Sequence, residues 1–359
     1  MKILCICPIG IGNYLLFYPA CKIIKEKQPG ISLHLLALKY PIVDLAAGDP
    51  LWDSIHVIDP VKEKSPFRIL EFIRKIRSLH FNCSLSFFPS NKWQYNLLPF
   101  ICGIKKRMAF KYALKKVASG SFLNNCMVPV DPCLHDVYQN MRLSETFLGR
   151  NLQSESVKFP PLYTQKDLEL ASTVMKEIMG QQIHVKKIAI HPGSSCENGM
   201  DVKRWEPERF GLLAERICTK INAHALIFGG PDEKKLKERV ASVMSVPCTI
   251  IEPVKLSVTA ALISQSVLCL CNDSGLMHIA ACCGIRVAAV FGPTDEKRNG
   301  PFGKGHLILR KNMPHFPLWT AGNVGVRNVP EGIDPIESLK ELSVDDAWAM
   351  VQPWLETVV

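Results

Sequence analysis

The sequence lacks the patterns that mark several common classes of protein. No apolar run among its 359 residues approaches the ~20 residues that cross a bilayer, so an integral membrane protein is not expected. No segment is low in complexity, and apolar residues make up 47% of the chain, which excludes an intrinsically disordered protein. The chain contains no D-x-D motif, so a metal ion held on a diphosphate by paired carboxylates is not indicated.

Metal-binding cysteine pairs are also missing. The chain has 14 cysteines, but none forms a C-x-x-C pair and no group has the spacing of zinc ligands. Cys5 and Cys7, like Cys269 and Cys271, stand two residues apart in apolar runs, as residues on one side of a buried strand do. We therefore expect reduced core cysteines in a cytoplasmic protein.

The first residues resemble an export signal only superficially. Lys2 precedes an apolar run over residues 3–11, but Pro8, Gly10 and Gly12 interrupt the run or follow it directly. The segment then continues into an amphipathic helix. We interpret it as a first strand and its loop.

Positive charge exceeds negative charge. The chain has 43 Lys and Arg against 33 Asp and Glu, a net charge of +10, which favours acidic partners such as nucleic acid, anionic lipid head groups or phosphorylated small molecules. We expect the excess to be spread along the chain, with its densest stretch over residues 104–116. That stretch is equally consistent with a solvated face and with an anion-binding role.

Strand-like and helix-like segments alternate along most of the chain, which predicts an α/β fold with parallel sheets. The expected strands cover residues 2–7, 31–38, 54–58, 83–88, 187–191, 225–228, 249–252, 267–270 and 287–291. The expected helices cover residues 14–27, 42–47, 67–79, 165–179, 207–221, 232–243, 257–265 and 274–283. Between residues 114 and 163 the alternation weakens.

Two similar α/β halves predict two Rossmann-like domains. The pair Pro160-Pro161 places the boundary, so that residues 1–161 form the first domain and residues 162–340 the second. Residues 341–359 form a C-terminal helix that could pack back toward the first domain. It opens with the capping box Ser343-x-x-Asp346 and is expected to bury Trp348, Val351 and Trp354.

Ligands of open parallel sheets bind beyond the carboxyl ends of the strands. After the first strand, Gly10 and Gly12 form a glycine-rich loop that opens a helix. As a dinucleotide fingerprint this loop fails, because the third glycine position holds Leu15 and no acid ends the next strand. A nicotinamide-dependent dehydrogenase is therefore not expected, and we interpret the loop as one that a ligand approaches closely.

Four polar, glycine-bearing loops follow strands of the second half. They cover residues 191–195, 229–233, 272–278 and 291–295. The pattern suits a diphosphate, because Ser274-Gly275 opens a helix whose free N–H groups attract anions. His278 lies one turn further along that helix, and Lys203 can supply a positive charge to a phosphate.

At these residues a family resemblance becomes specific. The strings HPGSS…KRWEPERF, FGGPDE, NDSGLMHIAA and VFGPTD, in this order and spacing, resemble glycosyltransferase family 9, the ADP-heptose-dependent heptosyltransferases of lipopolysaccharide core assembly. The strings LWDSIHVID and GIKKRMAF resemble the family more weakly, and the match covers about residues 1–300. It implies a GT-B fold, in which two Rossmann-like domains with parallel sheets face a central cleft. It also implies acceptor binding by the first domain, nucleotide-sugar binding by the second, and inverting transfer without a metal ion.

The resemblance also assigns roles to residues of the second domain. The diphosphate contacts fall on the loop of Gly193, and on Ser194, Ser195, Lys203, Ser274, Gly275 and His278. Glu233 corresponds to the acid that holds the ribose hydroxyls, and Leu256 to an apolar residue against the adenine. Asp273 corresponds to a carboxylate near the sugar. Gly10 and Gly12 lie in the acceptor-side loop.

The chain departs from the family at the position of the general base. Where the family usually has Asp, this chain has Asn13, and an amide cannot accept the proton of an acceptor hydroxyl at neutral pH. Three explanations are open: an engineered substitution, a natural enzyme with another base such as Asp44 or Asp49, and a binding protein that has lost catalysis. Two segments also depart, because residues 312–330 show no family pattern and residues 196–202 lengthen the donor loop.

These observations predict an inverting glycosyltransferase that moves a sugar, expected to be a heptose, from an ADP-activated donor to a glycan or glycolipid acceptor such as lipopolysaccharide core. Asn13 and Lys203 are its expected catalytic positions. The alternative is a catalytically impaired nucleotide-sugar or glycan-binding protein. No metal, cofactor or nucleic-acid partner is expected, and the place of action is the cytoplasm, with peripheral association at the inner membrane.

Overall fold

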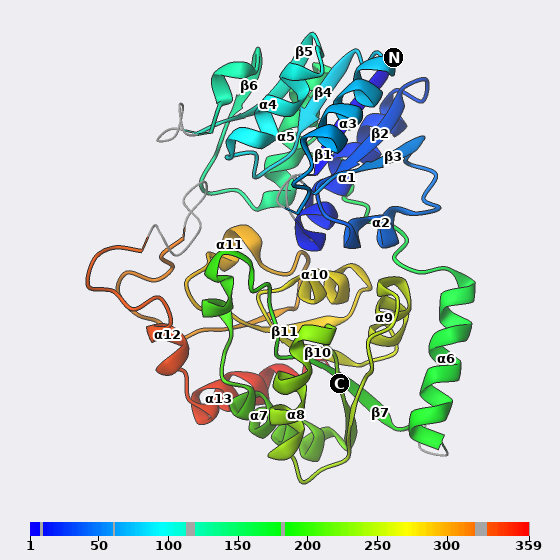
Figure 1. The fold of residues 1–359 in the computed structure, drawn as a ribbon. Helices are drawn as coiled ribbons and strands as arrows, with labels where there is room; N and C mark the ends of the chain where they lie inside the picture. Colours follow the sequence, from blue (N-terminus) through cyan, green and yellow to red (C-terminus); the bar gives the residue numbers. More distant parts are fainter. Residues whose placement is uncertain (8–9, 60–61, 113–118, 181–183, 320–328, 359) are drawn as a thin grey trace. The chain divides into compact units, whose positions relative to one another are not determined.

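The structure is a computed structural model that describes residues 1–358 apart from 8–9, 60–61, 113–118, 181–183 and 320–328. The chain divides into two compact units, Met1–Pro161 and Leu162–Val359 (Figure 1), and the division falls at the proline pair. All 14 cysteines lie in the described residues and are free. Among the described helices, none is both long enough and apolar enough to cross a bilayer.

The first unit is a parallel six-stranded sheet in the order β3-β2-β1-β4-β5-β6. Its strands are β1 (Lys2–Cys7), β2 (Ser32–Ala37), β3 (Ser54–Val57), β4 (Cys83–Ser86), β5 (Lys106–Lys111) and β6 (Cys126–Pro129). Its helices are α1 (Ile11–Lys27), α2 (Pro41–Ala46), α3 (Pro66–Ser78), α4 (Trp93–Ile101), the 3₁₀ turn η1 (Ser121–Leu123) and α5 (Asp136–Leu148).

The second unit has a parallel six-stranded sheet in the order β12-β11-β10-β7-β8-β9. Its strands are β7 (Lys186–His191), β8 (Ala223–Ile227), β9 (Cys248–Ile250), β10 (Leu268–Asn272), β11 (Arg286–Val290) and β12 (Leu307–Leu309). Its helices are α6 (Gln165–Met179), η3 (Glu197–Lys203), α7 (Pro207–Ile221), η4 (Pro231–Glu233), α8 (Lys234–Ser242), α9 (Leu256–Ile263), α10 (Gly275–Cys282), α11 (Glu296–Asn299), α12 (Glu337–Lys340) and α13 (Val344–Leu355).

Both sheets have the same strand order and therefore the same switch point. Each unit builds its sheet outward from its first strand, first to one side and then to the other, so that β1 pairs with β4 and β7 pairs with β10. At the carboxyl ends of such a central pair the two outgoing loops diverge and leave a crevice. The loop that carries Gly10 and Gly12 follows β1, and the HPGSS loop follows β7.

Local sequence signals explain where several helices begin. Thr164 and Asp167 form a capping box at the start of α6, and Ser343 and Asp346 form another at the start of α13. Helix α7 begins at Pro207, whose fixed φ suits the first turn of a helix. These three helices begin within a residue of their predicted positions.

Other elements were not predicted. Strands β5, β6 and β12 and helices α4 and α5 are absent from the predicted set. The polar and basic residues between residues 104 and 125 obscured β5, although its centre Met108–Phe110 is fully buried. The prediction that the C-terminal helix buries Trp348 and Trp354 was incorrect, because both are only half-buried in α13, which packs on α7 and β12.

Two buried histidines lie side by side in the first sheet. His34 Nδ1 on β2 is 3.3 Å from His56 Nε2 on β3, and both rings meet Phe81 edge-on. Burial is the main cause that lowers the pKa of both histidines, and the pKa of His56 falls to about 4, with the charges of His34 and Lys75 contributing.

These histidines should make stability depend on pH. The unfolded chain accepts protons on both histidines near pH 6.5, whereas in the folded chain the pKa of His34 is lowered and the pKa of His56 falls to about 4. The stabilisation that comes from keeping these histidines neutral should therefore be fully present above about pH 6.5. As the pH falls below about 6.5, the free energy of unfolding should decrease by up to ~1.4 kcal/mol per pH unit for each proton. In urea denaturation, His56→Phe should flatten this dependence, while His184→Phe at an exposed position should not. Equal slopes for wild type and His56→Phe would contradict this account.

Candidate active site

The polar loops of the second unit converge at its switch point. His191 is the last residue of β7, and Asn272 is the last residue of the neighbouring strand β10. Asp273 and Ser274 follow Asn272 and lead into α10, whose N-cap is Ser274. The crevice therefore lies beside a helix N-terminus, where free N–H groups and the helix dipole favour an anion.

His191 connects two of these loops. Its Nε2 lies 3.2 Å from Oε2 of Glu233, and its Nδ1 lies 2.9 Å from Oγ of Ser274. A carboxylate can only accept, so Nε2–H donates to Glu233, and in the neutral ring Nδ1 accepts from the Ser274 hydroxyl. Ser274 Oγ in turn accepts from the N–H of Met277, which caps α10. One imidazole thus fixes both the acid after β8 and the first turn of α10.

Glu233 is buried and ionised, and its carboxylate accepts three hydrogen bonds. Besides His191, its carboxylate accepts from Arg204 Nη2 at 3.2 Å and from the N–H of Gly230 at 2.8 Å. Burial acts to raise the pKa of Glu233, but the hydrogen bonds and charges of these partners prevail and hold that pKa below its ordinary value. Gly193 lies directly against the carboxylate, and a Cβ at that position would collide with Oε1. Only glycine fits there.

Lys203 and Asp273 form a buried ion pair. Lys203 Nζ donates to Oδ2 of Asp273 at 3.1 Å and to its backbone carbonyl at 3.0 Å, and Asn299 donates to Oδ1 at 3.1 Å. Burial alone would raise the pKa of Asp273, but the charges of Lys203 and His278 outweigh it and keep the pKa low. The ammonium group is therefore held at the carboxyl end of β10, next to the N-terminus of α10.

Asn272 fixes the segment that carries both cations. Its Oδ1 accepts from the N–H of Trp205 at 3.0 Å, and its Nδ2 donates to the carbonyl of Pro192 at 2.7 Å. Trp205 itself is fully buried in the core of the unit. Lys203 and Arg204, which directly precede it, are thereby kept beside the loops after β7 and β10.

The structure brings most of the predicted donor residues together. Ser194 is buried and its Oγ accepts from Arg204 Nε at 3.3 Å, while Gly275 is the first residue of α10 and His278 is buried one turn along. Ser195 is exposed, with its Oγ accepting from the N–H of Glu197. Leu256, half-buried, begins α9, and no printed contact joins it to this group within the described part of the chain.

The predicted acceptor-side residues belong to the first unit. Gly10 is the N-cap of α1, Gly12 is its second residue, and Asn13, half-buried, is its third. Of the two substitute bases, Asp49 is buried and its Oδ1 accepts from the N–H of Leu51 at 2.9 Å, while Asp44 is exposed on α2. Asp49 Oδ1 is thus engaged in the fold, whereas its buried Oδ2 has no hydrogen-bond partner among the described residues.

The two unusual segments have different places in the second unit. Residues 197–203 form the 3₁₀ helix η3, which delivers Lys203 to the crevice. Of residues 312–330, only 312–319 and 329–330 are described. Trp319 in this segment is fully buried, and its backbone N–H donates to the carbonyl of Pro293 at 2.9 Å. The prediction for residues 320–328 lies outside the described residues.

Sequence reasoning missed three functional side chains: His191, Arg204 and Asn272. Each was quoted within a motif, but none was assigned a role. The available signal was position, because His191 and Asn272 are polar residues that each follow an apolar run at the end of a strand, and the two strands proved to be neighbours.

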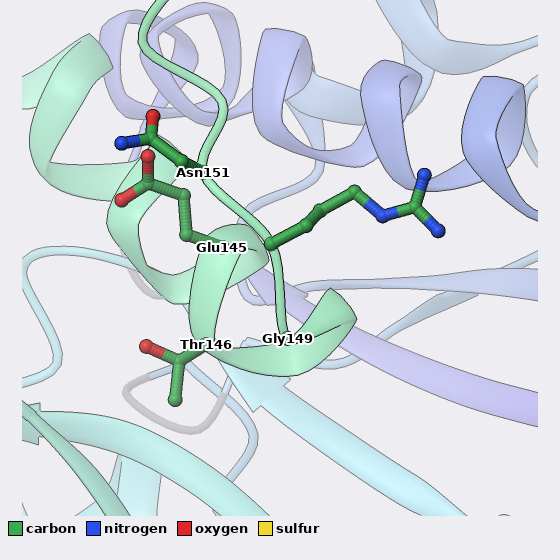
Figure 2. A pocket seen from close by; sticks show the side chains of 5 residues that line it. Glu145, Thr146, Gly149 and Asn151 are labelled. Carbon is green, nitrogen blue, oxygen red and sulfur yellow. The ribbon is translucent and has the colours of Figure 1, made fainter.

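A depression of about 390 Å³ lies at the end of α5 in the first unit and is separate from the candidate site (Figure 2). Glu145, Thr146, Gly149 and Asn151 surround it. Gly149 has a left-handed φ of 65° that ends the helix, and Glu145 Oε1 accepts from the N–H of Leu152 at 2.8 Å. These contacts close the end of α5, and we assign no ligand to this depression.

Each unit is a doubly wound α/β sheet, the architecture that GT-B glycosyltransferases have, and the second unit holds Lys203 and Arg204 near the N-terminus of α10. Comparison with known proteins agrees. The chain belongs to glycosyltransferase family 9 (heptosyltransferase), whose family model matches residues 69–322. The resemblance stated from the motifs is thereby confirmed.

A curated relative agrees with this membership, and solved structures agree with the fold. Lipooligosaccharide heptosyltransferase 2 of Haemophilus ducreyi is 25% identical over 323 residues, covering 86% of this chain and 88% of the relative. The glycosyl transferase family 9 structure from Veillonella parvula covers 99% of this chain and 97% of its own, with a TM-score of 0.79 at 16% identity. E. coli ADP-heptose LPS heptosyltransferase II covers 99% of both chains, with a TM-score of 0.72 at 16% identity. The predicted α/β GT-B fold is therefore confirmed.

Proposed function

We propose that the protein transfers a heptose from an ADP-activated donor to a glycan or glycolipid acceptor such as lipopolysaccharide core, with inversion and without a metal ion. The observation that carries the proposal is the crevice at the N-terminus of α10, where Lys203 is paired with Asp273 and Arg204 with the ionised Glu233. Cations and free N–H groups suit a diphosphate, and a buried carboxylate suits a ribose diol. Relatives whose names state ADP-heptose or lipooligosaccharide heptosyltransfer support this choice of donor and acceptor.

In the proposed reaction, the acceptor hydroxyl attacks the anomeric carbon from the face opposite the diphosphate. Negative charge then develops on the leaving ADP. Lys203, His278 and the N–H groups of the first turn of α10 are placed to stabilise that charge. We place the reaction in the cytoplasm at the inner membrane, where a glycolipid acceptor would be anchored.

A second candidate function rests on Asn13. An amide at the base position retains nearly the shape of Asp but cannot take a proton, which is the expected property of a protein that binds nucleotide sugar or glycan and turns over slowly. Mass spectrometry after incubation with ADP-heptose and a glycan acceptor separates the two functions. A heptosylated product supports transfer, and persistent donor with measurable binding supports the second candidate.

ADP alone should stabilise the protein against heat without added metal. At an ADP concentration of about one hundred times Kd, stabilisation of ~2.7 kcal/mol is expected, which a thermal melt detects readily. EDTA should leave the shift unchanged, because protein cations and N–H groups neutralise the diphosphate. An unchanged melting temperature at millimolar ADP, or a strict requirement for magnesium, would contradict the proposed site.

A further inference from the structure

The excess positive charge of the chain lies in one segment, contrary to the expectation that it is spread. Residues 72–130 contain ten Lys and Arg and no Asp or Glu, so the remaining 300 residues carry 33 charges of each sign and are neutral. The segment runs from the middle of α3 through β4, α4, β5 and η1 into β6. The net positive charge of the protein therefore lies in this segment of the first unit.

The helices of this segment cover one face of the first sheet. The apolar cluster beneath them includes Ile76 of α3 together with Tyr95 of α4 and Cys102 at its end, and η1 packs on α4. Helices α1 and α5 pack on each other instead. Right-handed crossovers place α3, α4 and η1 on one face and α1 on the other, because β1 to β3 and β4 to β6 extend in opposite directions (Figure 1).

Aromatic side chains project from this face beside the cations. Trp93 of α4 and Phe122 of η1 are 41% and 59% exposed, and their ring centroids are 5.6 Å apart. Arg107 lies over the ring of Phe100, 5.3 Å from its centroid, and its Nε donates to the carbonyl of Leu123, next to Phe122. These contacts join the rings and the guanidinium into one continuous patch.

Helix α3, on the same face of the sheet, adds an amphipathic surface that the fold leaves uncovered. All its residues are described, and of these it fully buries only Ile76. Phe67 is 78% exposed and Leu70 is 44% exposed, while Arg74 and Lys75 are also exposed. We call α3, α4, η1 and Arg107 together the aromatic-basic face. Several large apolar side chains exposed on one face of the sheet indicate a partner.

We propose that the aromatic-basic face docks on an anionic lipid bilayer. Lys and Arg are attracted to anionic head groups, and Trp and Phe rings favour the head-group level of a membrane. A helix with exposed Phe and Leu beside cations has the composition of an interfacial helix. Nucleic acid would satisfy the cations, but Leu70 and the exposed end of α3 at Phe67 would gain nothing from a phosphate backbone. The bilayer satisfies both components.

This inference extends the proposed function. It rests on that function in one respect, which is that a glycolipid acceptor would lie in such a bilayer. The two can fail separately. Docking is measured by binding to vesicles without acceptor, whereas transfer is measured with a delipidated, soluble acceptor that needs no membrane.

The test is cosedimentation of the full chain with vesicles of equal parts phosphatidylglycerol and phosphatidylcholine, compared with phosphatidylcholine alone. We expect binding to the anionic vesicles only. Arg74→Glu with Lys75→Glu should lower the partition coefficient by about tenfold or more, since each cation contributes about fivefold. The matched control is Lys234→Glu with Lys235→Glu, an adjacent exposed pair on α8, which should bind as wild type.

A second comparison isolates the aromatic contribution. Phe122→Ala should weaken vesicle binding several-fold even in high salt, whereas Tyr138→Ala, at 45% exposure on α5, should not. Melting temperatures and transfer to soluble acceptor should stay at wild-type values in all variants. If the Glu variants melt early, Arg74→Gln with Lys75→Gln replaces them. Absent vesicle binding, equal losses in the controls, or tighter binding to single-stranded RNA than to vesicles would each overturn the proposal.

Discussion

Replacing Asn13 with Asp should raise kcat by roughly one to four orders of magnitude with the right acceptor. The substitution places a carboxylate at the position where the family resemblance expects the general base, and a positioned base commonly contributes ~10²–10⁴ in rate. We extend the expected range down to about tenfold because the N-terminus of α1 favours the ionised carboxylate and so makes it a weaker base.

The same substitution should leave folding and donor binding nearly unchanged. Asn and Asp have almost equal volume. An acid in the first turn of α1 interacts favourably with the helix dipole and should stabilise the fold by ~0.3–1 kcal/mol. The donor residues belong to the second unit, so Kd for ADP should move little. Asn13→Ala serves as the control, since it removes the amide without adding a base. A rate that is already fast with Asn13 and unaffected by Asp would show that another group takes the proton.

Replacing Lys203 with Ala should weaken ADP binding by about ten- to one-hundredfold and lower kcat/KM at least as much. A hydrogen bond to a charged group is worth ~1.5–3 kcal/mol, and Lys203 is the buried ammonium beside the α10 terminus. Isothermal titration with ADP measures the first effect and steady-state kinetics the second. Lys234→Ala, at an exposed lysine of the same unit, should change neither.

Lys203→Ala also breaks the ion pair with Asp273, so a loss of stability must be separated from a loss of ADP binding. A double variant separates the two effects. Lys203→Ala leaves Asp273 buried without its main partner, which should lower stability by ~3–5 kcal/mol. Adding Asp273→Asn removes the stranded charge, so stability should recover in large part. If ADP affinity recovered equally, Lys203 would act only by neutralising Asp273, and its proposed contact with the diphosphate would be contradicted.

The sequence predicted the architecture because its signals are local. Strand β1 is a continuous apolar run from Ile3, α7 begins at a proline, and α6 begins at a capping box, so each can be found without knowing what it packs against. The α4–β5 region lacked such signals. Pro99 lies inside α4, and basic residues flank the buried centre of β5, so tertiary packing decides both elements.

The candidate site was predictable as a set of loops but not as a network. Strand ends show that His191 and Ser274 each belong to a polar loop. They do not show that residues 83 positions apart share a hydrogen bond, because that depends on β7 pairing with β10. The Gly193 requirement has the same origin. The resemblance offered glycine as a motif residue, and the carboxylate of Glu233 supplies the physical reason.

The common strand order of the two sheets also bears on how the crevices form during folding. In each unit the central pair joins residues 80 positions apart, Ile3 with Cys83 and Ile188 with Leu268, whereas every other described strand pair joins residues 37 positions apart or fewer. Closing a longer loop costs more chain entropy, and contacts of high sequence separation slow folding. The crevice of each unit thus opens along the seam between two three-stranded halves that are each more local in sequence. A ligand that spans the seam of the second unit would contact both halves. It would therefore stabilise the pairing of β7 with β10, whose formation costs the most chain entropy in that sheet.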